Sequence, residues 1–234
     1  MRQLPALQRY KEKQMKTVFI DLEFCEIPKQ NKEMRKTSKF EIIEVGAVKL
    51  DDQNRVIDRF DTFVKPQYGE ITTFITELTH IRPEDVNGAR EFGEVMDSFV
   101  EWLGEEDTLM YSWSSADWMQ IQRECRMKSY ENDRLESLYE EWVDFQMVFG
   151  KIIGIEQPIS LENALNGAGI VFEGRPHSAI ADAENTAALY ALTQNKEAFE
   201  ESAKQILEIM RPKPALSFSL GNLIPAEMLE KMEM

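Results

Sequence analysis

The chain has 234 residues, of which 42 are acidic and 27 are basic, so its formal charge is −15 at neutral pH. Hydrophobic residues make up 43% of the chain and aromatic residues 10%, which supports one large folded domain or two small ones and excludes wholesale disorder. No apolar run reaches the roughly 18 residues that span a bilayer, no signal peptide opens the sequence, and Cys25 and Cys125 are too few for a disulfide framework. We therefore expect a soluble, cytoplasmic protein with no membrane segment.

The acidic surplus argues against a broad polyanion-binding surface, but the charge is unevenly distributed. Residues 91–145 contain 15 acidic and 4 basic side chains, whereas residues 1–36 contain 9 basic and 5 acidic ones. Net charge governs solubility and long-range steering more than the chemistry of a local site. The composition therefore leaves open a nucleic-acid site that reaches phosphate through metal ions.

The first half of the chain predicts strands. Residues 1–15 are basic and mixed, and we interpret them as an N-terminal arm. Strands rich in β-branched and aromatic residues are expected at 17–22, 41–50 and 55–65, with a polar loop at 26–39. The last two strands are joined by a short turn-forming segment, so the three are expected to form an antiparallel meander.

The second half predicts mostly helices, because apolar residues recur there at a period near 3.6. The expected helices cover 73–78, 92–103, 117–128, 134–149, 160–168, 178–192 and 196–210, with a strand at 108–113. Pro212 and Pro214 end regular structure and leave a tail at 211–234. The order of elements predicts one α/β domain over 16–210, in which helices flank a five-stranded mixed sheet.

Two carboxylates mark the end of the first strand. Asp21 and Glu23 lie two residues apart, so their side chains point to the same face of the sheet. A charge at the end of an apolar strand is costly unless it is paired or bound to a metal. Taken alone, the pair fits equally well a strand end at Asp21 with Glu23 facing solvent.

A second group of polar residues lies around residue 180. His177 precedes an alanine-rich helix, and Asp182 falls in its second turn, next to a face of small residues that packs closely on something else. A single histidine in a loop is usually solvated or structural. Asp117 opens an earlier helix, and by itself it is explained as an acid at a helix N-terminus.

The combination is more specific than its parts. Carboxylates and a histidine occur in the order D-x-E, D, H-x4-D within three separate segments, FIDLEF, SWSSADWMQIQREC and LENALNGAGIVFEGRPHSAIADAENTAALY. Over residues 17–193 the sequence resembles the DEDDh 3′–5′ exonucleases of the DnaQ-like superfamily, in the branch of Eri-type exoribonucleases and KapD-like sporulation inhibitors. The resemblance implies a ribonuclease H-like αβα fold.

The family's roles carry over by position. The resemblance implies that Asp21, Glu23, Asp117 and Asp182 hold two divalent cations, Mg²⁺ or Mn²⁺, and that these ions clamp the attacking and leaving oxygens. It implies His177 as the base that deprotonates the attacking water, and a histidine changes charge near neutral pH. The implied substrate is the 3′ end of single-stranded RNA or DNA, with RNA modestly favoured, and the implied product is a nucleoside 5′-monophosphate.

The same resemblance implies a surface for the terminal nucleotide. Phe24, Leu78, Thr79 and Ile81 match the segments that pack on its base and ribose, although His80 stands where the family commonly has glycine. Core packing explains Phe24 at least as well, and a loop that caps the core explains Leu78 about as well. We leave Trp113 and Trp118 out of the site, because tryptophan at helical spacing usually belongs to the core.

One alternative belongs to a different functional class. A KapD-like regulator would keep the exonuclease fold and act by binding another protein or a second copy of itself. The acidic residues 91–145 and the apolar tail at 211–234 would then provide contact surfaces. A purely scaffolding protein has no physical need to keep four mutually repelling carboxylates and a histidine, so we favour the nuclease.

Overall fold

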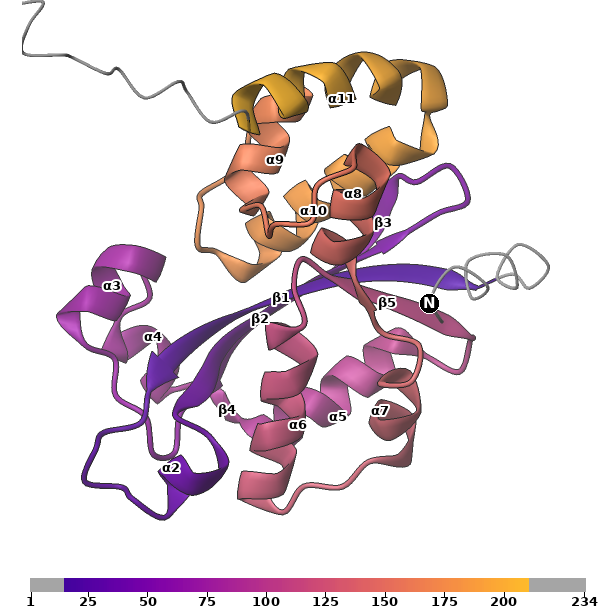
Figure 1. Ribbon diagram of the computed structural model, residues 1–234. Coiled ribbons are helices and arrows are strands. Elements are labelled where there is room, and N and C mark those ends of the chain that lie inside the picture. The colour runs from indigo at the N-terminus through magenta and orange to yellow at the C-terminus, as the bar shows by residue number, and fades with distance from the viewer. Residues whose placement is uncertain (1–14, 211–234) are drawn as a thin grey trace, which may run out of the picture.

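The computed structural model describes residues 15–210, in which a six-stranded sheet lies between two layers of helices (Figure 1). The strands follow the order β4-β3-β2-β1-β5-β6. Their bounds are β1 Lys16–Glu26, β2 Phe40–Leu50, β3 Val56–Lys65, β4 Arg90–Glu91, β5 Thr108–Ser112 and β6 Val143–Asp144.

The pairing of the strands confirms the predicted meander within a mixed sheet. Strand β2 runs antiparallel to both β1 and β3, whereas β5 pairs parallel with β1 and with β6, and β4 pairs parallel with β3. The expected number of five strands was wrong. Strands β4 and β6 have two residues each, which is too short to show a side-chain alternation in the sequence.

Two helical layers cover the faces of the sheet. Figure 1 shows α5, α6 and α7 on one face and α8 to α11 on the other. The helices are α2 Met34–Thr37, α3 Thr73–Thr79, α4 Pro83–Asn87, α5 Phe92–Leu103, α6 Ala116–Lys128, α7 Asp133–Leu138, α8 Phe145–Ile153, α9 Leu161–Ala168, α10 Ala179–Gln194 and α11 Lys196–Met210.

The two cores follow from the alternation of side chains along β1. Val18 and Ile20 are buried against α5, α6 and α7, while Phe19 between them is buried against the opposite layer. Alternate side chains of a strand point to opposite faces, so the run of apolar residues in β1 serves both cores. This confirms the predicted αβα arrangement.

The helix expected at 134–149 was wrong, because two helices and a short strand occupy it. Helix α7 ends at Leu138, Val143 and Asp144 pair with the end of β5, and α8 begins at Phe145. The Asp144 carboxylate accepts a hydrogen bond of 2.9 Å from the backbone N–H of Met147 and so caps α8. The loop expected at 26–39 contains the one-turn helix α2, and α4 was not predicted.

The remaining helix predictions hold to within a few residues. Ser160 caps α9 as expected, since its hydroxyl accepts from the backbone N–H of Asn163 at 3.2 Å. No helix among residues 15–210 is long and apolar enough to cross a bilayer. The basic arm and the tail lie, apart from residue 15, outside the described residues, so these domain boundaries stay predictions.

Candidate functional site

The five residues of the D-x-E, D, H-x4-D pattern line one cavity of about 470 Å³, which we call the carboxylate cavity. Strand β1 contributes Asp21 and Glu23, α6 contributes Asp117, and the loop and first turns of α10 contribute His177 and Asp182. These residues are up to 161 positions apart in the sequence, from 21 to 182. The structure therefore brings together every residue of the predicted catalytic set.

The two carboxylates of β1 face this cavity beside the antiparallel neighbour β2. Asp21 lies opposite Gly46, and Glu23 lies opposite Glu44. Glu23 is only 7% exposed. Both carboxylates line the cavity, so the reading in which Glu23 simply faces solvent does not hold.

Asp117 and Asp182 reach the cavity from the starts of two helices. Asp117 lies in the first turn of α6 and is 5% exposed, and backbone groups of Leu22 and of Asp117 itself hydrogen-bond its carboxylate. Asp182 lies in the first turn of α10. Carboxylates at helix N-termini are stabilised by the helix dipole, so this placement partly offsets the cost of burying them.

His177 is held next to Asp182 by the loop that precedes α10. Its backbone N–H donates a hydrogen bond of 3.0 Å to Oδ2 of Asp182, and its φ of 60° places it in the left-handed region. One ligand atom each from Glu23, His177 and Asp182 lie within 4.8 Å of one another. A nitrogen and two carboxylate oxygens can thus reach one small volume.

Helix α10 sits this close to the sheet because of Gly46. A Cβ atom built on Gly46 would lie 2.1 Å from the backbone nitrogen of Ile180, so no other residue fits at this position without displacing the helix. Gly46 lies opposite Asp21 in the register, and Ile180 lies two residues before Asp182. The glycine therefore allows Asp182 on α10 to come close to Asp21 on β1.

Glu44 is a site residue that sequence reasoning missed. It is 5% exposed, and its Oε2 accepts a hydrogen bond of 3.0 Å from the backbone N–H of Ala179, the first residue of α10. Burial raises its pKa to about 7. A glutamate within the apolar run of β2 was the available signal, because a buried carboxylate needs a donor.

Burial raises the pKa of each of the four predicted metal-binding carboxylates. It raises the pKa of Glu23 to about 8, with the charges of Asp182 and Glu44 adding to the rise. It raises the pKa of Asp117 to about 7 and that of Asp182 to about 6, although His177 opposes the rise at Asp182. The pKa of Asp21 is raised well above its ordinary value by burial and then by repulsion from Asp117 and Asp182.

These raised pKa values mean that the ionised set repels itself, and among residues 15–210 no lysine or arginine forms an ion pair with its members. Clustered carboxylate oxygens are ligands for hard divalent cations such as Mg²⁺ and Mn²⁺. The cavity lacks thiolate ligands. The donor set therefore fits a divalent cation.

Of the four predicted substrate-binding residues, Phe24 alone lines the carboxylate cavity. Phe24 also packs against the core, as the alternative reading expected. Thr79 and Ile81 are 1% and 2% exposed, and the Thr79 hydroxyl accepts from the backbone N–H of Ile81 at 3.1 Å. Leu78 is partly buried in α3. A contact of these three residues with substrate stays a prediction.

The backbone conformation at His80 shows why glycine is common at this position in the family. It ends α3 with φ 64° and ψ 7°, the left-handed conformation, and its backbone N–H donates to the carbonyl oxygen of Thr76 at 2.8 Å. Left-handed C-caps are usually glycine, because a Cβ atom crowds the backbone there. Here a histidine adopts the same left-handed backbone conformation, in which its Cβ atom is crowded by the backbone.

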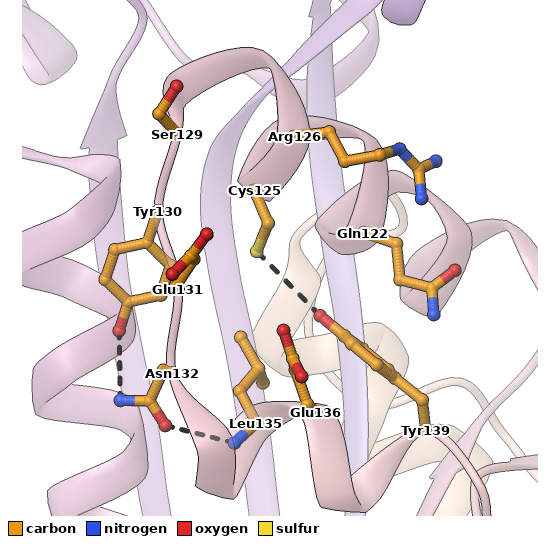
Figure 2. A pocket seen from close by; sticks show the side chains of 10 residues that line it. All are labelled: Gln122, Cys125, Arg126, Ser129, Tyr130, Glu131, Asn132, Leu135, Glu136 and Tyr139. Atoms are coloured by element: carbon orange, nitrogen blue, oxygen red, sulfur yellow. Dashed lines mark hydrogen bonds between the residues drawn. The ribbon is translucent and has the colours of Figure 1, made fainter.

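A larger cavity of about 600 Å³ lies between α6 and α7, away from the carboxylates. Figure 2 shows Cys125 facing Tyr139 in this cavity, with sulfur and hydroxyl oxygen 3.9 Å apart. Burial raises the pKa of Cys125 to about 11, so the thiol stays protonated at neutral pH. This cavity offers neither an activated nucleophile nor a cluster of metal ligands among its lining residues, and we assign it no chemistry.

Comparison with known families identifies the chain. Residues 18–190 match the model of the family described as exonuclease, RNase T. The chain belongs to the exonuclease family. This exonuclease-family chain is 31% identical over 180 residues to ERI1 exoribonuclease 2 of Xenopus laevis, a match that covers 66% of this chain and 25% of the relative. The chain thus spans about a quarter of that relative's length.

Solved structures share the fold. The nuclease domain of 3′hExo, a DEDDh family member bound to rAMP, matches with a TM-score of 0.65 and 20% identity, covering 77% of the exonuclease-family chain and 92% of that domain. Escherichia coli exonuclease I in complex with a dT13 oligonucleotide matches with a TM-score of 0.62 and 15% identity, covering 86% of this chain and 47% of the other. These matches confirm the predicted fold class.

Proposed function

We propose that the protein is a metal-dependent 3′–5′ exonuclease that removes nucleoside 5′-monophosphates from the 3′ end of single-stranded nucleic acid. The observation that carries the proposal is the convergence of Asp21, Glu23, Asp117, His177 and Asp182 on one cavity. The similarity to an exoribonuclease favours RNA modestly over DNA. A related fold in complex with a DNA oligonucleotide keeps DNA within the substrate class to be tested.

In this proposal Asp21, Glu23, Asp117 and Asp182 would hold two divalent cations, Mg²⁺ or Mn²⁺. Such ions polarise the scissile phosphate when they are bound. The protein contributes the positioning: β1 fixes Asp21 and Glu23, while the close packing of α10 on Gly46 fixes Asp182. Glu23 and Asp117 are buried, so their charges act at a lower effective dielectric constant than they would in water.

His177 serves as the general base in this proposal. The hydrogen bond from its backbone N–H to Asp182 fixes the loop, so the imidazole stays next to the carboxylates while its ring accepts a proton from the attacking water. Phe24, at the wall of the cavity, is the proposed contact for the terminal base. The base then returns its proton to solvent after the product leaves.

The test is digestion of 5′-labelled RNA and DNA oligonucleotides of one sequence with Mn²⁺. The wild type should produce a ladder that shortens from the 3′ end. Asp21→Ala and Asp182→Ala should abolish turnover, whereas His177→Ala should lower it by a factor on the order of 100 or more and leave calorimetric Mn²⁺ binding largely intact. Asp52→Ala, at an exposed turn, is the matched control and should retain activity. A ladder of equal intensity from Asp21→Ala would contradict the proposal.

The regulatory alternative receives no specific support from residues 15–210. Its contact surfaces were the acidic stretch 91–145 and the tail 211–234, and the tail lies outside the described residues. Most of the acidic side chains in the stretch are exposed, in loops as well as on helices, and Asp117 belongs to the carboxylate cavity. A pulldown with the double variant Asp21→Ala/Asp182→Ala and with a chain ending at Arg211 separates a binding role from catalysis.

A further inference from the structure

A basic loop joins β1 to β2 directly after the site residues of β1. Residues 27–39 contain five basic side chains and one acidic one, in a chain whose net charge is −15. Lys29, Lys32, Lys36 and Lys39 are all exposed. Among these four, Lys36 pairs with Glu33 at 2.6 Å, and the other three have no ion pair among residues 15–210. The basic loop therefore presents uncompensated positive charge.

The basic loop is anchored by hydrogen bonds at both of its ends, one shortly after the site residues of β1 and the other on α6. At its start, Ile27 follows Glu23 by four residues, and the Arg35 guanidinium donates to the Ile27 carbonyl and, at 2.9 Å, to Glu26. Phe24, between these positions, lines the cavity. The first end of the basic loop is thus fixed by an arginine that is not available for other partners.

At its other end, the loop is fixed to α6 within one helical turn of Asp117. The Gln120 amide donates to the carbonyl of Phe40 at 2.7 Å and accepts from the Ser38 hydroxyl at 3.0 Å. Gln120 is 3% exposed, so both hydrogen bonds are shielded from water. Residues three apart on a helix lie on the same face, so the two neighbours of Lys39 in the chain are held within one helical turn of Asp117.

An exposed aromatic ring accompanies the lysines. Phe40 follows Lys39 directly and is 45% exposed at the start of β2. Surfaces that bind single strands without sequence preference combine a positive track for phosphates with aromatic rings on which bases stack. The two parts of such a surface lie next to each other in the chain, at Lys39 and Phe40, and Phe40 contacts α6 one helical turn from Asp117.

We propose that the basic loop holds the phosphates on the 5′ side of the scissile bond, through Lys29, Lys32 and Lys39, with Phe40 as a stacking contact. The inference rests on the proposed function, because it assigns the path of the strand whose 3′ end enters the carboxylate cavity. A strand carries one negative charge per nucleotide, and residues 91–145 repel it. The loop gives this acidic protein a local surface that attracts the substrate.

The test compares a short substrate with a long one. Thymidine 5′-monophosphate p-nitrophenyl ester reaches the carboxylate cavity without a 5′ strand, so its hydrolysis reports the cavity alone. The triple variant Lys29→Gln/Lys32→Gln/Lys39→Gln should hydrolyse this ester like the wild type. For a 12-nucleotide single strand it should raise KM by about tenfold or more with kcat little changed, since lost phosphate contacts weaken binding without touching the chemistry.

Salt dependence gives a second, independent readout. Binding of the labelled 12-nucleotide strand to Asp21→Ala protein is measured by anisotropy between low and high salt. Each neutralised phosphate of a single strand contributes about 0.7 to the slope of log K against log salt, so the three substitutions should lower that slope by about 2. The matched control Lys65→Gln/Lys151→Gln/Lys196→Gln removes three exposed lysines elsewhere and should change neither KM nor slope.

The outcomes separate the two proposals. If the wild type fails to hydrolyse the ester and the oligonucleotide alike, the proposed function fails. If ester hydrolysis is intact and the loop variant matches the control variant in KM and in salt slope, the strand takes another path and the inference is overturned. Phe40→Ala should raise KM for the strand about threefold or more with the salt slope unchanged, and an unchanged KM would remove the stacking contact from the proposal.

Discussion

The protein contains two groups of buried carboxylates that solve the same electrostatic problem differently. In the first, Glu41 and Glu124 are both fully buried, and the Lys128 ammonium lies 2.8 Å from a carboxylate oxygen of each. Glu41 also accepts from the backbone N–H groups of Gln67, Tyr68 and Gly69. In this first group, which we call the lysine cluster, the protein supplies its own cation.

The carboxylate cavity contains the four predicted acids together with Glu162, and none of them forms an ion pair with a lysine or arginine among residues 15–210. Burial of Lys128 by itself lowers its pKa, but Glu124 and Glu41 outweigh this effect and the pKa is raised. Charge that a lysine balances is structural, whereas charge left unbalanced at a cavity needs an external cation. The comparison shows that buried acids indicate a functional site when no basic side chain of the protein is paired with them.

The largest expected effect tests the lysine cluster. Lys128→Met keeps the apolar stem but leaves Glu41 and Glu124 buried without a cation, so the free energy of unfolding in urea should fall by about 3–5 kcal/mol. The exposed-site control Lys65→Met should change it by less than about 0.5 kcal/mol. If Lys128→Met is as stable as the control, the lysine is not the counter-charge and the contrast between the two groups collapses.

The next effect concerns pH and metal. The folded-state pKa values of Glu23, Asp117 and Asp182, about 8, 7 and 6, lie above those of the unfolded chain, so the folded state binds more protons between about pH 4 and pH 8. Stability should therefore fall as pH rises, and the melting temperature in EDTA should drop by on the order of 10 °C from pH 5 to pH 8.

Saturating Mn²⁺ should reverse most of this drop at pH 8 and change little at pH 5, where protons compete for the carboxylates. Burial also raises the pKa of Glu124 to about 7, although Lys128 opposes the rise. The part of the drop in melting temperature that comes from Glu124 should therefore remain when Mn²⁺ is added. A melting temperature that Mn²⁺ raises equally at both pH values would argue against binding at these carboxylates.

A smaller effect has the opposite sign from that of Lys128→Met. Asp21→Asn removes one of the charges that repel one another, so metal-free protein at pH 8 should become more stable by about 1–2 kcal/mol while catalysis is lost. Differential scanning calorimetry in EDTA measures this change. A destabilised Asn variant would mean that the Asp21 carboxylate makes favourable contacts that outweigh its repulsion.

The smallest effect is expected at Glu44. Glu44→Gln keeps an acceptor for the N–H of Ala179 and removes a charge that raises the pKa of both Asp21 and Glu23. The variant should gain less than about 1 kcal/mol at pH 8 without metal, and the fall of stability with rising pH should be smaller and should end at a lower pH. A loss of more than about 1 kcal/mol would show that the N–H requires a charged acceptor.

Much of this arrangement could be predicted from the sequence, because local patterns carried it. The long strands are rich in β-branched and aromatic residues, α5 has a clear helical period, and the residues Asp21, Glu23, Asp117, His177 and Asp182 occur at recognisable spacings. That these five residues share one site was predicted from the family resemblance, because their positions in the sequence do not show which of them lie close together. The structure brings all five to one cavity, which periodicity alone could not show.

What the sequence could not show depends on tertiary contacts. The break between α7 and α8 depends on the pairing of Val143 with Tyr111 and on the cap by Asp144, which no periodicity reports. The role of Gly46 depends on how closely α10 packs on the sheet. Gly46 and Ile180, which meet there, are more than 130 positions apart in the sequence. Glu44 and the lysine cluster look like ordinary strand and helix charges until their burial is known.

The contact between Gly46 and the start of α10 also has a consequence for motion. Asp21 is on the sheet and Asp182 is on the helix, so a cation held by both would fasten the first turns of α10 to β1 and oppose their local opening. Amide hydrogen exchange of Ala181 and Ala183 would then slow on metal addition, while exchange in α5 would not change. In that case the bound ion would hold α10 against the sheet, and its loss would allow the first turns of the helix that carries Asp182 to open.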